Sequence, residues 1–123
     1  MKRILLAEDD RFLRRAAQTK LEQAGYTVEV AVDGEEALAA LRRTPPDLML
    51  LDLLMPKKDG LEVLREMKAD EAIRDVPVVI LSNSSKAIDM DNARLLGARQ
   101  YWVKANVTLQ ELCHRVNVIL GAN

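Results

Sequence analysis

The chain has 123 residues, of which 49% are hydrophobic and 30% charged, a composition typical of one globular domain. Its 18 basic and 19 acidic residues leave a formal net charge of −1, which removes the usual reason to expect direct binding to nucleic acid. Cys113 is the single cysteine, so an internal disulfide is excluded and a reducing compartment is expected. We therefore predict a single domain over residues 1–123 that is located in the cytoplasm.

The apolar runs of the sequence are too short to span a membrane. The first seven residues, Met1–Ala7, resemble the start of a signal peptide, but Glu8, Asp9 and Asp10 end the apolar run after four residues. The apolar core of a signal peptide needs about 7–15 residues. We therefore expect neither secretion nor a membrane partner.

The first half of the chain alternates between the two hydrophobic periodicities. Ile4–Ala7 is a short apolar run typical of a buried strand. Arg11–Ala24 carries apolar residues at steps of four, four and three, which predicts a helix that the following glycine ends. Thr27–Val32 alternates apolar and polar residues, so we expect a half-exposed strand at a sheet edge. A second helix over Glu35–Arg43 stops before two prolines.

The second half repeats this alternation. Apolar runs predict further strands at Leu48–Leu51, Val76–Leu81 and Tyr101–Val103. Helices are predicted from Asp59 onward, over Ala87–Leu96, and after the capping box Thr108-x-x-Glu111. A strand followed by a helix, five times over, predicts an α/β protein whose parallel sheet is covered by helices on both faces.

Polar and charged residues directly follow four of the predicted strands. These residues are Glu8, Asp9 and Asp10, then Asp52, then Ser82 and Asn83, and finally Lys104. Each has an ordinary structural explanation, such as a helix N-cap at Asp10 or a solvated ammonium at Lys104. In a parallel sheet, however, the carboxyl ends of the strands share one edge, where ligands bind. The coincidence of carboxylates, a hydroxyl and an ammonium at that edge therefore indicates a functional site.

The charges of these residues indicate what the site binds. Two carboxylates about 4 Å apart repel by about 4 kcal/mol at an effective dielectric constant near 20. Among Glu8, Asp9 and Asp52, either one carboxylate is therefore protonated or cations balance the charges. Lys104 supplies one positive charge, and all-oxygen ligands favour Mg²⁺ over zinc for the rest. Asp52 then suits a nucleophile toward phosphorus, because aspartate forms acyl phosphates. Ser82 and Lys104 would bind the other phosphoryl oxygens.

Over essentially its whole length the chain resembles the receiver domains of two-component response regulators. The matching segments are residues 4–10, 46–60, 77–82, 97–98 and 101–104. The resemblance implies a flavodoxin-like doubly wound (βα)5 fold, with a five-stranded parallel sheet in the order 2-1-3-4-5. It also implies that residues 1–123 are one receiver domain.

The resemblance assigns a role to each residue of the predicted metal site. Asp52 would be the phosphoacceptor. Glu8 and Asp9 would be the acidic pair that holds Mg²⁺, with the backbone carbonyl of Leu54 and Asp52 as further ligands.

Three further residues receive roles from the same resemblance. Lys104 would contact the phosphoryl group, and Ser82 would be the hydroxyl that reports phosphorylation. Tyr101 would be the aromatic switch residue that turns inward on activation. The protein would then be a switch and not an enzyme, catalysing only its own phosphorylation and dephosphorylation.

The resemblance also implies the partners. The phosphoryl donor would be a sensor histidine kinase or a histidine phosphotransfer protein. The phosphorylated form would act on a downstream effector protein or on an output domain outside this sequence, as a monomer or weak dimer.

Three other functions remain as alternatives. A Mg²⁺-dependent aspartyl-phosphate hydrolase with a similar sheet usually has a second acid two residues after the nucleophile, where this chain has Leu54. A nucleotide or flavin binder needs a phosphate-binding loop after the first strand, where three acidic residues would repel phosphate. A receiver-like protein that binds partners without phosphorylation would not need the complete acid, hydroxyl and lysine set.

One position departs from the family pattern. The family usually has proline after the lysine, whereas Lys104 is followed by Ala105. A cis bond before a residue other than proline costs about 2.5–4 kcal/mol, so we predict a trans peptide between these two residues.

Overall fold

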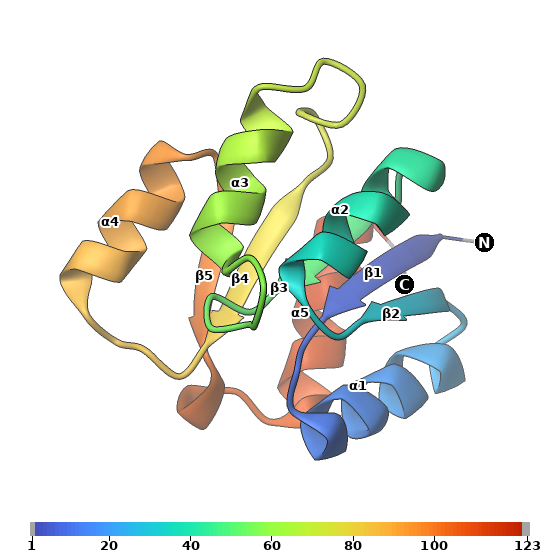
Figure 1. Ribbon diagram of the computed structural model, residues 1–123. Helices are drawn as coiled ribbons and strands as arrows, with labels where there is room; N and C mark the ends of the chain where they lie inside the picture. The colour runs from blue at the N-terminus through green and yellow to red at the C-terminus, as the bar shows by residue number, and fades with distance from the viewer. Residues whose placement is uncertain (1, 122–123) are drawn as a thin grey trace.

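The computed structural model describes residues 2–121, which form one parallel sheet of five strands in the order β2-β1-β3-β4-β5 (Figure 1). The strands are β1 (Arg3–Ala7), β2 (Thr27–Ala31), β3 (Leu48–Leu51), β4 (Val78–Ser82) and β5 (Gln100–Val103). The helices are α1 (Arg11–Gln23), α2 (Gly34–Arg43), α3 (Gly60–Lys68), α4 (Ala87–Leu95), the short 3-10 helix η1 (Lys104–Asn106) and α5 (Leu109–Leu120). The predicted doubly wound α/β fold and its strand order are confirmed.

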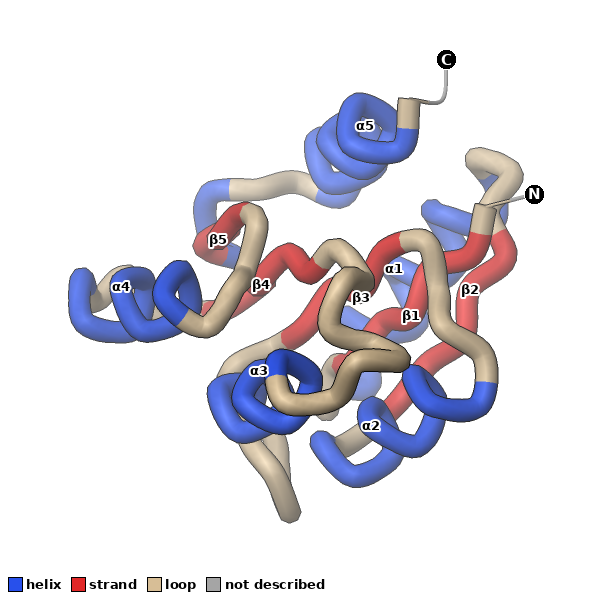
Figure 2. The backbone as a smooth tube through the Cα atoms, turned by 90° about the horizontal axis from the view of Figure 1, so that it is seen from above, coloured by secondary structure: helices blue, strands red, loops and turns tan. Residues whose placement is uncertain are grey.

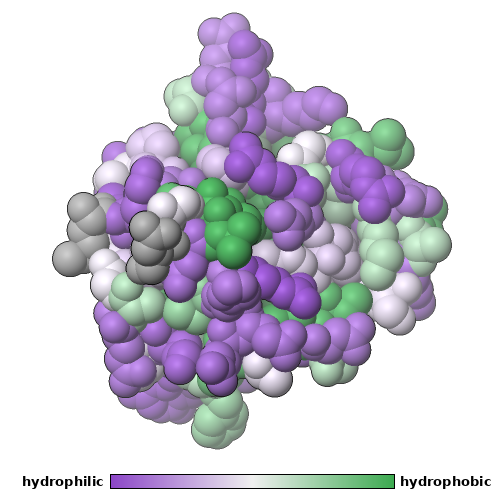
Figure 3. Space-filling model, turned by 180° about the vertical axis from the view of Figure 1, so that it is seen from behind, coloured by the Kyte–Doolittle hydropathy of each residue, from purple (hydrophilic) through white to green (hydrophobic). Residues whose placement is uncertain are grey.

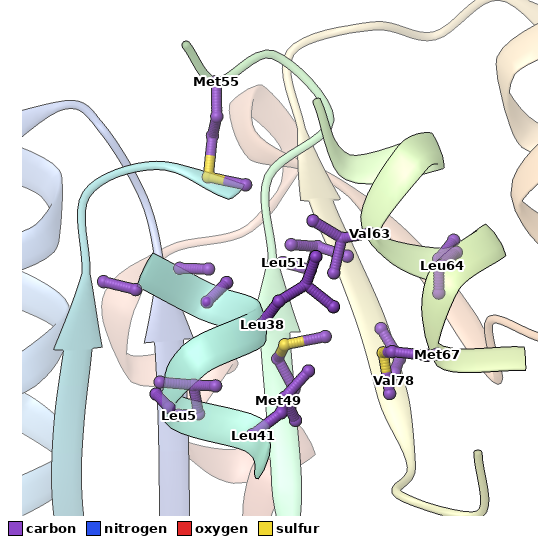
Figure 4. Close-up of a cluster of buried hydrophobic side chains, with 14 of the residues drawn as sticks. Leu5, Leu38, Leu41, Met49, Leu51, Met55, Val63, Leu64, Met67 and Val78 are labelled. Carbon is purple, nitrogen blue, oxygen red and sulfur yellow. The ribbon is translucent and has the colours of Figure 1, made fainter. Parts of the chain in front are cut away.

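Helices cover both faces of the sheet (Figure 2). On one face, Leu5 and Met49 of the strands belong to a buried cluster with Leu38 of α2 and Val63 of α3 (Figure 4). Each of these four side chains is at most 2% exposed. Burying an aliphatic side chain of this size stabilises a fold by about 1.5–3 kcal/mol. This cluster therefore fixes α2 and α3 against the central strands.

The opposite face carries α1 and α5. There Ile4 and Leu48 of the strands pack with Leu21 of α1 and with Leu112 of α5. Successive residues of a strand point to opposite faces, so the continuous apolar runs of β1 and β3 supply both clusters.

The sheet has two edge strands, β2 and β5. The expectation that the alternating segment Thr27–Val32 lies at an edge is confirmed, and four of the five residues of β2 are partly or fully exposed. β4 begins at Val78, two residues later than predicted from the apolar run. The reason is local: the Val76 N–H donates to the Ile73 carbonyl, and Pro77 has no N–H to donate to the sheet.

Most of the helices begin with a capping side chain. Asp10, Asp33, Asp59 and Thr108 accept hydrogen bonds from backbone N–H groups of α1, α2, α3 and α5. Such a cap stabilises a helix by about 1 kcal/mol. α4 differs, because its N-cap residue, Lys86, makes no capping bond with its side chain.

The surface is largely polar. Figure 3 shows the face opposite to that of Figure 1, where hydrophilic side chains predominate and hydrophobic ones form separate patches. Among the helices of residues 2–121, none combines the length and the hydrophobicity that a transmembrane span requires.

Candidate functional site

The carboxyl edge of the sheet brings three acidic side chains together. The backbone N–H of Glu8 donates to Ala31 and that of Asp52 donates to Ala7, which continues the strand pairing past the ends of β1 and β3. One carboxylate oxygen each of Glu8, Asp9 and Asp52 therefore lies within 4.8 Å of the other two. Glu8 and Asp52 are buried, whereas Asp9 is exposed. The predicted acidic cluster forms.

Lys104 directly follows β5, and its side chain reaches this cluster. Its Nζ lies 2.6 Å from Oε1 of Glu8 and 3.2 Å from Oδ2 of Asp52, and its side chain is 12% exposed. With all four groups ionised, three carboxylates and one ammonium leave two uncompensated negative charges. The site therefore favours a further cation.

Burial governs the protonation of this group of residues. It raises the pKa of Glu8 to about 7, with a further contribution from the charge of Asp52, against the opposing effects of Lys104 and the Asp10 N–H. Burial alone would lower the pKa of Lys104, but the adjacent Glu8 and Asp52 outweigh it and raise the pKa. Lys104 is therefore charged near neutral pH.

The residues present fit a divalent cation. Oε1 of Glu8 is buried and, among residues 2–121, has no hydrogen-bond partner of good geometry; it faces the Lys104 ammonium. The acidic cluster opens into a cavity of about 350 Å³. Its lining residues are Glu8, Asp9, Asp10, Asp52, Leu54, Asn83 and Lys104. An all-oxygen set at an open cavity suits a hard metal ion, so the acidic cluster is able to bind one.

Leu54 lies at the rim of this cavity. Its backbone N–H donates to Oδ1 of Asp52 at 3.3 Å, and its side chain is 70% exposed. An apolar group thus stands where solvent approaches the Asp52 carboxylate. The role of the Leu54 carbonyl as a metal ligand stays a prediction.

Within residues 2–121, the two predicted switch residues form hydrogen bonds with Ser84 and none with the acidic cluster. Ser82 is fully buried, and its Oγ accepts a hydrogen bond from the Ser84 N–H at 3.1 Å. The Tyr101 hydroxyl is partly buried and donates to the Ser84 carbonyl at 2.9 Å. Both residues are therefore hydrogen-bonded to the loop between β4 and α4.

Two contacts of the site were not predicted from the sequence. The Arg14 guanidinium donates to the carbonyls of Glu8 and Asp9, and Ser84 bonds both switch residues. Arg14 stands four residues after the helix-capping Asp10, so helical spacing turns it back toward the acidic loop. That spacing is a signal in the sequence, whereas the Ser84 contacts depend on the path of a loop.

The departure at Ala105 is accommodated without a cis bond. No cis peptide occurs in the described part of the chain, so the predicted trans peptide after Lys104 is confirmed. The 3-10 helix Lys104–Asn106 takes up this segment.

Comparison with known proteins identifies the family. Residues 4–117 match the model of the response regulator receiver domain. The chain belongs to this family. A relative among the curated proteins is a probable transcriptional regulator, ycf27, of Porphyridium aerugineum, which is 39% identical over 118 residues. The match covers 96% of this chain and 48% of that protein, so the receiver domain spans about half the length of such relatives.

Solved structures of receiver domains agree with this assignment. The phosphorylated cyanobacterial phytochrome response regulator RcpA is 38% identical, with a TM-score of 0.83 and coverage of 96% of this chain and 90% of that one. The Mn²⁺-bound form of response regulator Rcp1 is 34% identical, with a TM-score of 0.83 and coverage of 97% and 91%. The chain is therefore similar to receiver domains in both sequence and fold.

Proposed function

We propose that this receiver domain is a phosphorylation-controlled switch. It accepts a phosphoryl group on Asp52 from the phosphohistidine of a sensor histidine kinase or phosphotransfer protein, and it then changes a protein-binding face. The observation that carries the proposal is the surroundings of Asp52: a buried carboxylate at the end of a central strand, 3.2 Å from a lysine and beside two further acids.

The transfer follows from these surroundings. An Asp52 oxygen attacks phosphorus, the new P–O bond forms as the P–N bond to the imidazole breaks, and the imidazole keeps the electron pair and takes up a proton. Lys104 binds oxygens of the phosphoryl group during the transfer. Its ammonium already lies 3.2 Å from an Asp52 oxygen, so it is close to the place where the phosphoryl group arrives. Ser82 and Tyr101 then report the new charge to the protein surface.

Mg²⁺ is the metal that this chemistry favours. Asp9, Asp52 and the Leu54 carbonyl would hold it, with Glu8 acting through water, and the ion would neutralise charge on the phosphoryl group. With all four groups ionised, its two charges equal the excess negative charge left by the three carboxylates and Lys104. The Mn²⁺-bound form of Rcp1, 34% identical to this chain, supports the binding of a divalent cation by this domain.

The relatives also support phosphorylation over the alternatives. RcpA, 38% identical, is described in its phosphorylated form. A hydrolase would need an acid near the attacking water, but the side chain at that position is the exposed, apolar Leu54. We therefore propose a phosphoacceptor and not an enzyme acting on other substrates. Its place would be the cytoplasm, and its target an effector protein or an output domain of a longer chain.

Intact-mass measurement with acetyl phosphate tests the proposal. The wild-type protein should gain the mass of one phosphoryl group, and only when Mg²⁺ is present. Asp52→Asn should gain none, whereas Asp91→Asn, which removes an exposed carboxylate on α4, should behave as wild type. Equal modification of Asp52→Asn at another carboxylate would contradict the assignment.

A further inference from the structure

Arg14 of α1 holds the backbone of the acidic loop, Glu8–Asp10. Its Nη1 donates to the Glu8 carbonyl at 3.0 Å and to the Asp9 carbonyl at 3.3 Å. The sheet hydrogen bonds of this segment end at the Glu8 N–H, and the helix hydrogen bonds begin at the Asp10 carbonyl, which accepts from the Arg14 N–H. The two carbonyls that the guanidinium binds lie between these ladders. Arg14 thus supports a stretch of backbone that neither the sheet nor the helix fixes.

The two carbonyls determine the conformation of Asp9. One belongs to the peptide before Asp9 and the other to the peptide after it. Each peptide unit is planar, so the orientations of these two units set φ and ψ of Asp9. The second unit is held on both sides, because its N–H, that of Asp10, donates to Oε2 of Glu8 at 3.0 Å. The direction of the Cα–Cβ bond of Asp9, and with it the place of its carboxylate, therefore depends on Arg14.

Asp9 is the acid of the cluster with the least support from other side chains. Glu8 and Asp52 are buried, and each lies within 3.2 Å of the Lys104 ammonium. Asp9 is exposed, and its carboxylate forms no hydrogen bond or ion pair within residues 2–121. A metal ion binds more tightly to ligands that are held in place before it arrives, because less freedom is lost on binding. For Asp9, that restraint comes through its backbone.

The charge of Arg14 acts on a bound cation in the opposite direction. A guanidinium close to a metal site repels the metal, so its charge alone predicts tighter binding of Mg²⁺ once the arginine is removed. Its hydrogen bonds predict weaker binding, because the Asp9 carboxylate loses its restraint. The sign of the change in affinity therefore distinguishes the two effects.

We propose that Arg14 is a positioning residue of the metal site, which pre-organises the Asp9 carboxylate for Mg²⁺ through the backbone carbonyls of Glu8 and Asp9. The proposal rests on the Mg²⁺ site of the function proposed above and adds a residue behind its ligands. Arg14 is not among the residues that line the cavity around Asp52, so it acts through Asp9 and not on the ion itself.

Titration of three single variants with Mg²⁺ tests the proposal. The dissociation constant of Mg²⁺ is measured from backbone amide NMR shifts, without a phosphodonor, for wild type, Arg14→Met, Arg14→Lys and Arg15→Met. Arg14→Met should raise the constant about tenfold, the lower end of the loss that follows removal of a partner of a metal ligand. Methionine and arginine have similar helix propensities, so α1 is retained.

Two of these variants separate position from charge. Arg15 is the matched control, because it is exposed on the same helix and forms no hydrogen bond or ion pair within residues 2–121. Arg15→Met removes the same charge and should not raise the dissociation constant. Arg14→Lys keeps the charge and a donor, so it should bind Mg²⁺ more tightly than Arg14→Met. Repulsion by charge predicts the reverse order for the two variants of Arg14.

Two measurements on the metal-free protein separate positioning from stability. The NMR order parameters of the Asp9 and Asp10 amides should fall from about 0.85, the value of a rigid backbone, toward about 0.6 in Arg14→Met, and stay high in Arg15→Met. Urea denaturation records the loss of stability of each variant. Lower stability alone leaves the dissociation constant of the folded protein unchanged, so it does not imitate the expected result.

The outcomes separate this role of Arg14 from the function on which it rests. Wild-type protein that binds Mg²⁺, with Arg14→Met binding equally or more tightly, overturns the positioning role alone. An equal loss of affinity in Arg15→Met also overturns it, because the effect would not depend on the two carbonyls. Wild-type protein that binds Mg²⁺ but gains no phosphoryl group at Asp52 overturns the proposed function and leaves the positioning role standing. Wild-type protein that binds no Mg²⁺ overturns both.

Discussion

Gly60 is the position where the smallest possible side chain should disturb Asp52, the proposed phosphoacceptor. A Cβ at this residue would lie 2.5 Å from the Asp52 carbonyl oxygen and 2.9 Å from Cα of Leu53, both backbone atoms. Ordinary contacts of this kind begin near 3.4 Å, so Gly60→Ala forces a shift of roughly 1 Å between α3 and the end of β3. The Gly60 N–H bond to the Leu53 carbonyl, 2.8 Å long, opposes that shift.

The shift has a cost in stability and a cost in rate. Overpacking against rigid structure costs about 1–3 kcal/mol, and the better helix propensity of alanine returns up to about 1 kcal/mol. We therefore expect Gly60→Ala to lower the free energy of unfolding by about 1–2 kcal/mol, measured by urea denaturation. A 1 Å displacement of reacting groups costs about a hundredfold in rate, so phosphorylation of Asp52 by acetyl phosphate should slow by up to that factor.

Gly97→Ala separates the two effects. Gly97 has φ near +100°, so alanine is strained there, by about 1–2 kcal/mol, although no atom lies within 4 Å of the new Cβ. This residue precedes β5 at the amino edge of the sheet, away from Asp52. The control should lose similar stability and keep the wild-type rate. A Gly60→Ala protein with wild-type stability and rate would refute the steric argument.

Three further predictions follow from other contacts. Leu54→Asn should shorten the lifetime of the acyl phosphate, because an amide at the cavity rim can position the attacking water and leucine cannot. Leu95→Asn, at a residue of α4 that is similarly exposed, should leave the lifetime unchanged. A longer lifetime in Leu54→Asn would count against this role of Leu54. Asp10→Ala should lower the free energy of unfolding in urea by about 1 kcal/mol, because two N–H groups of α1 lose their acceptor; no change would mean that water replaces the cap. Burial, assisted by the nearby Cys113, raises the pKa of Tyr26 above 10.0, so the folded protein keeps this phenol neutral when the unfolded chain ionises it. The contribution of the Tyr26 shift to the free energy of unfolding should therefore be present in full below pH 10 and be lost as the pH rises above it. In urea titrations at a series of pH values, Tyr26→Phe should show a smaller fall.

The continuous apolar runs made the central sheet predictable. A run such as Leu48–Leu51 has no polar residue to place in water, so it is buried on both faces and its strand is central. The charged residue that follows such a run must then lie at the carboxyl end of its strand. Because parallel strands end on the same side of the sheet, Glu8 and Asp52 could be placed together. The edge position of β2 followed from the same rule applied to an alternating segment.

The contacts of Lys104 and Ser84 could not be predicted from local sequence patterns, because they depend on how distant segments are arranged in space. The sequence places Lys104 after the last strand, but its distances to Glu8 and Asp52 depend on the strand order, which came from resemblance and not from periodicity. The Ser84 hydrogen bonds depend on the path of a four-residue loop between β4 and α4. Three serines and one asparagine occur within positions 82–85, and nothing in their order distinguishes the residue that bonds Tyr101.

The edge strand β2 exposes backbone groups along which a strand of another copy could pair. Glu29 stands at the middle of this strand, and its carboxylate is paired with Arg3 and with Arg43. A strand from another chain that paired along β2 would have to strip water from these charges, so the open row of backbone groups is a poor template for growth. Replacing Glu29 by valine would leave four consecutive β-branched residues at positions 27–30 of this edge. The ion pairs that add little to folding should therefore disfavour pairing of β2 with a strand of another copy.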